Sequence, residues 1–155
     1  MVKLLLWALA LLAAATAAGA IWFRAAPDDV AIWHVDPLAG MSTGKPNEAR
    51  VAPAGASGDL ESPVFEMAPA ELMARLDAVA LAEPRARRLA GDPAEGFATY
   101  VQRSALMGFP DYVSVRAVDL GEGRSALAIW SRSRYGHSDL GVNRARLERW
   151  MAALP

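Results

Sequence analysis

The chain contains no cysteine and only two histidines among its 155 residues. The absence of cysteine excludes a disulfide framework, a thiolate zinc site, a cysteine nucleophile and a lipidated N-terminal cysteine. The net charge of −1 argues against a protein that binds nucleic acid through overall positive charge. Sequence motifs for phosphate loops and dinucleotide binding are also absent. We therefore expect no nucleic-acid partner, no metal site and no cofactor.

One long apolar run stands at the N-terminus. No charged residue occurs from Leu4 to Phe23, and a helix of this length spans about 30 Å, the thickness of a bilayer's hydrocarbon core. Lys3 and the α-amino group precede the run, which favours a cytoplasmic N-terminus. We therefore expect residues 1–24 to anchor the chain in the inner membrane as a single pass, with the C-terminal domain in the periplasm.

A cleaved signal peptide is the alternative for the same segment. Residues 15–17 and 18–20 both fit a cleavage site with small residues at alternate positions. The apolar run continues past both sites through Trp22 and Phe23, which favours the retained anchor. Cleavage would instead give an exported soluble protein, and either outcome places residues 25–155 outside the cytoplasm.

The rest of the chain is long enough for one hydrophobic core. Residues 25–62 are expected to form an extended linker or wrap, because the stretch from Pro37 to Pro63 is rich in small residues and proline. Residues 63–155 are expected to form an α+β core. Its first helix begins at Pro69, carries apolar residues at helical spacing and ends before Pro84.

Alternating apolar residues predict an antiparallel sheet in this core. Strands are expected at 97–102, 113–118 and 126–131, with 87–90 as a further candidate and a short one at 64–67. A closing helix carries one apolar stripe of Leu140, Leu147, Trp150, Met151 and Leu154. The expected architecture is α+β, with an N-terminal transmembrane helix followed by one two-layer domain that has an antiparallel sheet and two main helices.

The densest polar stretch runs from Ser131 to Arg146, across a loop into the start of the closing helix. Free N–H groups and the helix dipole make such a position suitable for anions. We expect Arg132 and Arg134 to hold an anionic group, with Asp111, Asp139 and Asn143 fixing the two arginines. The complete candidate ligand-binding set is Arg132, Arg134, Ser138, Asp139, Asn143, Arg146 and Asp111. The alternative is a structural network of hydrogen bonds and ion pairs.

Catalysis has weaker support in the sequence, and no catalytic residue is assigned. A hydrolase would use His137 with Asp111 or Asp139, but no G-x-S-x-G nucleophile motif occurs. A metal site would need His34 and His137 to converge with a carboxylate, and their spacing is not a metal signature. Arg103 is expected to pair with Asp111 or Asp119 across strands.

The polar stretch, written Ser131-Arg132-Ser133-Arg134-x-Gly136-x-Ser138-Asp139-x-Gly141-x-Asn143-Arg144-x-Arg146, resembles the closing motif of the domain-of-unknown-function 1499 family. Residues 109–113 and 33–37 resemble further parts of the family pattern, and the similarity covers most of residues 29–154. The resemblance implies a small extracytoplasmic domain behind one hydrophobic segment, without an established reaction. The motif positions that it carries over are Asp36, Asn47, Asp111, Arg132, Arg134, Asp139, Asn143 and Arg146.

These observations predict a membrane-anchored extracytoplasmic domain that is a non-catalytic binding module. Its expected partners are the membrane, through residues 4–23, and the anionic group of a small molecule, a lipid headgroup or an envelope partner. A protein partner is not identified by the sequence. The alternatives are the hydrolase described above and a structural or assembly protein of the envelope.

Overall fold

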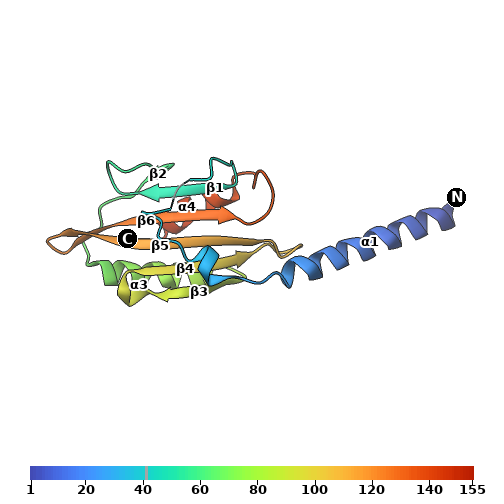
Figure 1. The fold of residues 1–155 in the computed structure, drawn as a ribbon, viewed down its shortest axis with the longest axis horizontal. Helices are drawn as coiled ribbons and strands as arrows, with labels where there is room; N and C mark the ends of the chain where they lie inside the picture. Colours follow the sequence, from blue (N-terminus) through green and yellow to red (C-terminus); the bar gives the residue numbers. More distant parts are fainter. Residues whose placement is uncertain (41) are drawn as a thin grey trace.

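A six-stranded sheet dominates the computed structural model, which describes residues 1–40 and 42–155 (Figure 1). The strands lie in the order β2-β1-β6-β5-β4-β3. Every neighbouring pair is antiparallel except β1 with β2. The strand bounds are β1 Glu48–Ala52, β2 Leu60–Glu61, β3 Ala86–Asp92, β4 Phe97–Arg103, β5 Pro110–Gly121 and β6 Arg124–Ser133.

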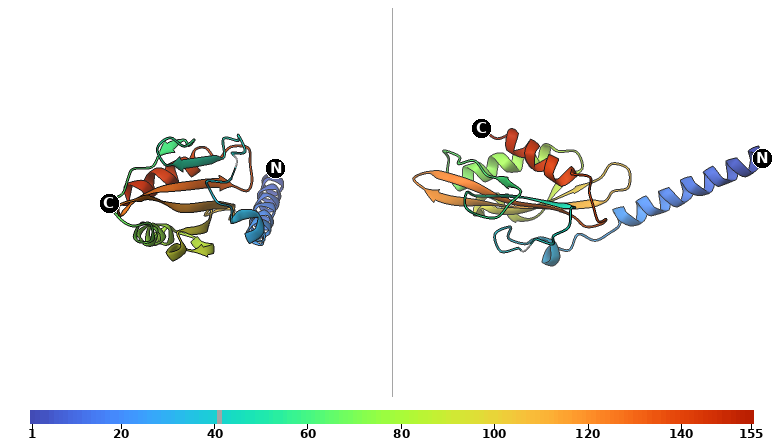
Figure 2. Two further views of the ribbon diagram at one scale, coloured as in Figure 1. Left: turned by 60° about the vertical axis from the view of Figure 1, so that its left-hand side comes forward. Right: turned by 90° about the horizontal axis from the view of Figure 1, so that it is seen from above.

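Two amphipathic helices form the second layer, on one face of this sheet (Figure 2). The helix bounds are α1 Val2–Arg24, α2 Val30–Trp33, α3 Pro69–Ala82 and α4 Val142–Ala152, with a 3₁₀ turn η1 at Pro93–Glu95. Helix α3 begins at Pro69 because proline needs no hydrogen-bond acceptor in the first turn. The expected α+β class, with two main helices on an antiparallel sheet, is confirmed.

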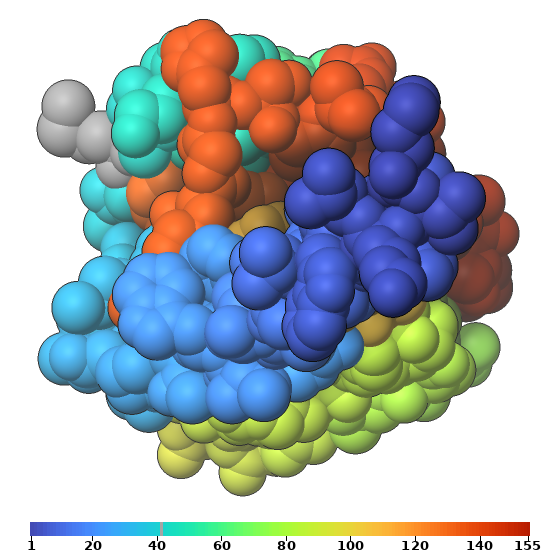
Figure 3. Space-filling model, turned by 90° about the vertical axis from the view of Figure 1, so that its right-hand side faces the viewer, coloured from blue at the N-terminus to red at the C-terminus, as the bar shows by residue number. Residues whose placement is uncertain are grey.

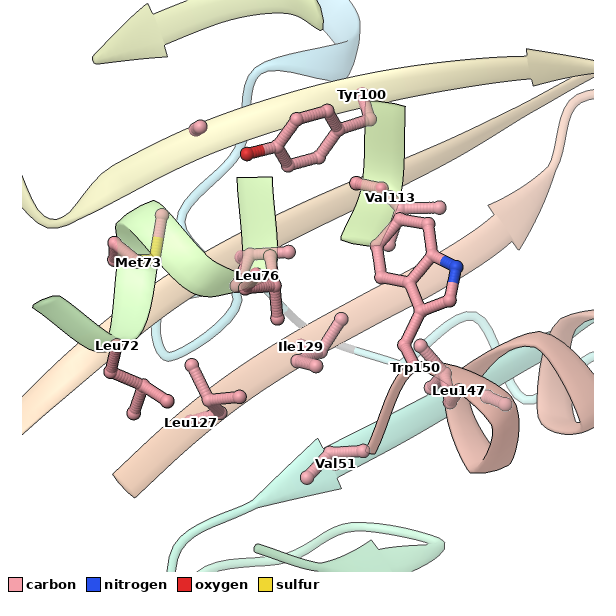
Figure 4. Packing of buried hydrophobic residues seen from close by; sticks show 14 of the residues in the cluster. Val51, Leu72, Met73, Leu76, Tyr100, Val113, Leu127, Ile129, Leu147 and Trp150 are labelled. Atoms are coloured by element: carbon pink, nitrogen blue, oxygen red, sulfur yellow. The ribbon is translucent and has the colours of Figure 1, made fainter. Parts of the chain in front are cut away.

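The hydrophobic core lies between the sheet and the helices α3 and α4 (Figure 4). Leu76 of α3 and Trp150 of α4 face Val113 and Ile129 of the central strands, and all four side chains are buried. The ring of Tyr100 meets Trp150 edge-on, with 5.9 Å between centroids. Each such side chain contributes about 1.5–3 kcal/mol through burial, so this layer attaches both helices firmly.

The opposite face of the sheet is covered by residues 25–40, the covering segment. The Trp33 ring stacks on Tyr112 at 3.9 Å. His34 shares a hydrogen bond of 2.8 Å between its Nδ1 and Thr99 Oγ1, and Thr99 bonds Ser114 on the next strand. The buried hydroxyls are thus satisfied by one another and by the covering segment.

One strand was not predicted, and one helix position was wrong. The stretch from Pro37 to Pro63 contains β1, which inserts between β2 and β6 and buries Ala49 and Val51 in the core. The pattern was too short to stand out among small residues. Leu140 lies outside α4 and is 95% exposed, since the Asp139 carboxylate accepts the backbone N–H of Asn143 and starts the helix later.

Helix α1 projects from the domain and makes few contacts with it (Figures 1 and 2). It has 23 residues with a mean hydropathy of 2.2 over its most apolar window, and 6% of that window is buried. Most of its large apolar side chains are exposed, as a lipid-facing helix requires. The helix is therefore long and apolar enough to cross a membrane.

Candidate functional site

Arg146 of α4 lies at the centre of a buried polar network between α4 and the sheet. Its Nε donates to Gln102 Oε1 at 2.6 Å, and its Nη2 donates to Asp111 Oδ2 at 2.6 Å. Its Nη1 donates to Ser131 Oγ and Asn143 Oδ1. The Arg146 side chain is 3% exposed and that of Asp111 is 15% exposed. One guanidinium thus joins three strands to the helix.

Asn143 extends the same network to the first strand. Its Nδ2 donates to the Asn47 carbonyl at 3.0 Å and to Ser133 Oγ at 2.9 Å. Its backbone N–H donates to Asp139 Oδ2 at 2.7 Å. The side-chain amide of Asn47 donates to the Gly136 carbonyl at 2.7 Å, which fixes the loop after β6. The motif residues of this network therefore bind one another, as the structural alternative predicts.

Arg132 lies on the other face of the sheet. Its guanidinium stacks 3.8 Å from the Trp130 ring centroid, and its Nη2 donates to the Trp33 carbonyl at 2.9 Å. Burial lowers the pKa of Arg132, while the nearby Glu48 carboxylate opposes this shift and Arg50 adds to it. Arg132 thus holds the covering segment against the sheet.

Arg134 and Ser138 also lie apart from the Arg146 network. Arg134 Nη1 donates to the Pro27 carbonyl at 2.6 Å, and Ser138 Oγ accepts the N–H of Leu140 at 3.2 Å. The expectation that Asp111, Asp139 and Asn143 fix Arg132 and Arg134 is therefore wrong. Successive side chains of β6 point to opposite faces, so Ser131 and Ser133 meet α4 while Arg132 points away.

A pocket lies between the end of β6 and the start of α4. This loop pocket has a volume of about 260 Å³. Its lining is Ser104, Phe109, Asp111, Ser133, Tyr135, Gly136, Ser138, Asp139 and Val142. Its only charged side chains are Asp111 and Asp139, so its electrostatics do not suit an anion.

A second cavity beside it is lined by arginine. This arginine groove has a volume of about 290 Å³ and shares Ser104, Asp111 and Val142 with the loop pocket. Its full lining is Glu83, Pro84, Arg85, Gln102, Arg103, Ser104, Asp111, Val142, Arg146 and Arg149. The lining thus contains four arginines and two carboxylates. Arg103 is also paired with Asp28 outside the lining, so the excess positive charge comes from Arg85. An anionic group would fit here better than in the loop pocket.

The groove arginines differ in how far they are already paired. Arg146 binds Asp111, and Arg149 Nη2 lies 3.1 Å from Glu83 Oε1. Burial alone would raise the pKa of Glu83, but hydrogen bonds from Gln102, Arg149 and Trp150 hold it below its usual value. Arg85 is exposed and forms no ion pair within residues 1–40 and 42–155.

Arg85 also has an unusual backbone. Its φ of +60° lies in the left-handed region that arginine rarely adopts. Its Nε donates to the Arg103 carbonyl at 3.0 Å, which orients the guanidinium along the groove. Such strain is concentrated at functional sites in many proteins. The sequence did not identify Arg85, Arg103 and Arg149 as site residues. A signal was available, because Arg85 follows the end of the first predicted helix and Arg103 follows the end of a predicted strand.

Arg103 connects this groove to the end of α1. Its Nη1 donates to the Phe23 carbonyl at 2.9 Å, and its Nη2 donates to the Ala26 carbonyl and to Asp28 Oδ1. The expected pairing of Arg103 with Asp111 or Asp119 is therefore wrong. The partner lies in the segment after α1, where no strand pattern could indicate it.

Asp28 is the acceptor of this junction, and its side chain is 7% exposed. Burial alone would raise its pKa, but hydrogen bonds from Tyr112, Arg103 and Arg87 outweigh this effect. The net result is a pKa below the ordinary aspartate value. Asp28 thus remains ionised in neutral solution and holds three donors from different strands.

The histidines do not form a catalytic or metal site in the described residues. His137 is exposed and has no hydrogen bond to a carboxylate there. His34 stacks on Phe97 on the far face of the sheet, where burial and then the Arg116 charge lower its pKa. Residues 1–40 and 42–155 contain no group of three metal-ligating side chains.

Comparison with known families finds one match. The model of a protein family of unknown function, DUF1499, matches residues 41–154. The chain belongs to the DUF1499 family. The matched region contains β1, all strands and helices that follow, and every residue of the Arg146 network. It begins after Trp33-His34-Val35-Asp36-Pro37, so that segment lies outside the match. No curated protein and no solved structure matches the chain significantly.

Proposed function

We propose that this DUF1499 protein is a membrane-anchored extracytoplasmic binding module that holds an anionic group in the arginine groove. The observation that carries the proposal is the lining of that groove, which contains four arginines and two carboxylates and in which Arg85 has no ion pair among the described residues. Guanidinium groups bind phosphate and carboxylate through paired, charge-assisted hydrogen bonds. No nucleophile and base are paired in the groove lining, so binding without catalysis fits best.

Arg85 and Arg149 are the residues that would contact the anion. Both are exposed, whereas Arg146 is 3% exposed and its guanidinium is already bound on all three nitrogens. Arg149 would exchange part of its pairing with Glu83 for the ligand, and Arg85 would supply an unpaired charge. The buried network behind them would keep the groove rigid, which lowers the entropic cost of binding.

The groove lies at the end of the domain that carries α1, because Arg103 lines it and also bonds the last turn of the helix. A phosphate or carboxylate bound there would therefore lie near the membrane surface. The same chemistry is offered by a lipid headgroup and by a free small anion.

The test is a titration of the full-length protein in neutral detergent, with thermal unfolding as the readout. The probes are inorganic phosphate and short-chain phosphatidylglycerol, with short-chain phosphatidylcholine as the zwitterionic reference that has no net charge. Ligand at 100 times its Kd stabilises the native state by about 2.7 kcal/mol, which gives a measurable rise in Tm. A response to phosphate identifies a small-anion site, and a response to phosphatidylglycerol alone identifies a headgroup site.

Two variants on α4 make the titration specific. Arg149→Ala removes a groove arginine that is 56% exposed and paired with Glu83. Arg144→Ala removes an arginine of the same helix that is 52% exposed and paired with Glu148, outside the groove. The proposal expects R149A and Arg85→Ala to lose the response and R144A to keep it. Equal responses in wild type, R85A and R149A would refute it.

The topology is part of the proposal. Lys3 and the α-amino group support a cytoplasmic N-terminus, with the domain in the periplasm and α1 as a single pass of the inner membrane. Protease added to intact spheroplasts should then digest the domain and leave α1 protected. The mass of the mature protein checks the alternative, because a chain that begins at Ile21 would be an exported soluble protein.

A further inference from the structure

We propose that the loop between β4 and β5, residues 104–109, inserts its tip into the interfacial layer of the lipid bilayer beside α1. This docking loop would give the domain a second membrane contact and a fixed orientation. The inference rests on the proposed anchoring of α1 and is independent of the arginine groove. Its occupant is the lipid bilayer itself.

The docking loop reaches the depth of the apolar helix. Met107 Cε lies 3.4 Å from the position that a Cβ on Gly19 would take. Gly19 lies four residues inside the end of the apolar run at Phe23, which is about 6 Å along the helix axis. Ala20 is 8% exposed although α1 is otherwise largely bare. A bilayer that covers the apolar run to its end therefore also meets the loop (Figure 2).

The tip of the docking loop is apolar and unprotected. Leu106 is 74% exposed, and Trp22, on the neighbouring turn of α1, is 64% exposed. Phe109 packs against Phe23 with ring centroids 4.4 Å apart, and Phe23 also contacts Tyr135 at 5.0 Å. Aromatic rings at the end of a membrane span favour the headgroup layer. The exposed Leu106 side chain thus adds apolar surface beside the aromatic residues at the end of the anchor. Figure 3 shows the domain from the side on which α1 projects.

The backbone of the docking loop is largely satisfied from within the protein. Arg24 Nη2 donates to the carbonyls of Ala105 and Leu106 at 3.0 and 2.8 Å. Arg103 Nη1 donates to the Gly108 carbonyl at 3.1 Å. The Ser104 backbone N–H donates to the Phe109 carbonyl at 3.0 Å, and the Ser104 carbonyl accepts the N–H of Gly108 at 3.1 Å. Irregular backbone tolerates a low-dielectric environment only when its polar groups are bound in this way.

The junction makes the loop and the helix move together. Arg103 bonds the carbonyls of Phe23 and Ala26 and the carboxylate of Asp28, and Arg24 bonds the loop. The apolar run is only about as long as the hydrocarbon core is thick. Lifting the loop from the bilayer would therefore expose the last apolar turn of α1 to water.

The cysteine-free chain allows a direct depth measurement in full-length protein reconstituted into vesicles of phosphatidylcholine and phosphatidylglycerol. A nitroxide is attached to single cysteines in Leu106→Cys, Ala13→Cys and Leu120→Cys. Leu120 lies near the β5–β6 hairpin at the opposite end of the sheet and is 39% exposed, which makes it the matched control. Collision with oxygen, which concentrates in lipid, is compared with collision with a water-soluble nickel complex.

The inference expects L106C and A13C to favour oxygen several-fold more than L120C does. A lipid-like value for A13C with equal, water-like values for L106C and L120C would overturn the docking loop and leave the anchor intact. Water-like values at all three positions would overturn both the anchor and the loop. Neither result depends on the response to anions, so this measurement and the groove titration fail independently.

Discussion

Arg146 offers the sharpest test of the buried network. In Arg146→Met, the aliphatic stem is kept but the guanidinium is lost, together with its bonds to Gln102, Ser131, Asn143 and Asp111. Removing one partner of a buried ion pair typically costs about 3–5 kcal/mol, because the remaining charge stays buried and unpaired. Domains of this size are stabilised by about 5–15 kcal/mol in total, so R146M should lose a large part of that.

The assay is thermal unfolding of the full-length chain in neutral detergent, followed by tryptophan fluorescence. Trp150 lies one turn after Arg146 in the core and reports on the attachment of α4. At about 3 °C per kcal/mol for a chain of this length, R146M should lower Tm by about 10 °C. The control is Arg144→Met, which removes an exposed pair with Glu148 at i+4 and should cost about 0.5 kcal/mol or less.

A second variant separates lost pairing from lost packing. Arg146→Met combined with Asp111→Leu removes both charges, so no buried carboxylate remains without a partner. The double variant should recover part of the Tm lost in R146M, because an unmet buried charge costs more than an absent pair. If R146M and R144M lower Tm equally little, the network does not hold α4, and the reasoning fails.

Three further predictions concern stability. Asp28→Asn should remove acid sensitivity from the junction, as measured by unfolding at graded pH. The pKa of Asp28 is lower in the folded than in the unfolded protein. The stabilisation from its carboxylate is therefore present above about pH 4 and is lost as the pH falls below that value. Asp139→Ala should lower stability by about 1 kcal/mol in urea unfolding, since the Asp139 carboxylate accepts the backbone N–H groups of Gly141 and Asn143 at the start of α4. Leu140→Gly should raise stability by about 0.5–1 kcal/mol in the same assay, because Leu140 has φ +55° and is 95% exposed; a decrease would show that its side chain has a binding partner.

The fold was largely predictable because its signals are local. The helix that begins at Pro69 and the alternating strands each depend on residues close in sequence. Strand β1, which was not predicted, shows the limit of local signals, since Ala49 and Val51 form a core pattern only beside β6. The partner of Arg103 shows another limit, because Asp28 lies 75 residues away and its position depends on how the covering segment crosses the sheet.

For the candidate site, the sequence showed which stretch gathers polar residues but not which of them contact one another. The predicted strand alternation, extended by two residues, already separates Arg132 from Ser131 and Ser133. Applying that alternation would have divided the motif into the residues of the Arg146 network under α4 and Arg132 on the opposite face of the sheet. The groove arginines could not be found in this way, because they come from β4, α4 and the turn before β3, which meet only in the folded domain.

The division of the motif changes what its residues imply about function. Asn143 and Arg146 are buried and fully engaged with the protein, so their chemistry is explained by folding alone. The anion proposed above would therefore be bound by groups outside the Arg146 network, and Arg85, which is exposed and has a left-handed backbone, is such a group. Loss of stability in R146M and loss of anion response in R85A are then separable effects. If stability and the anion response always change together in a series of variants, the ligand would instead lie within the Arg146 network.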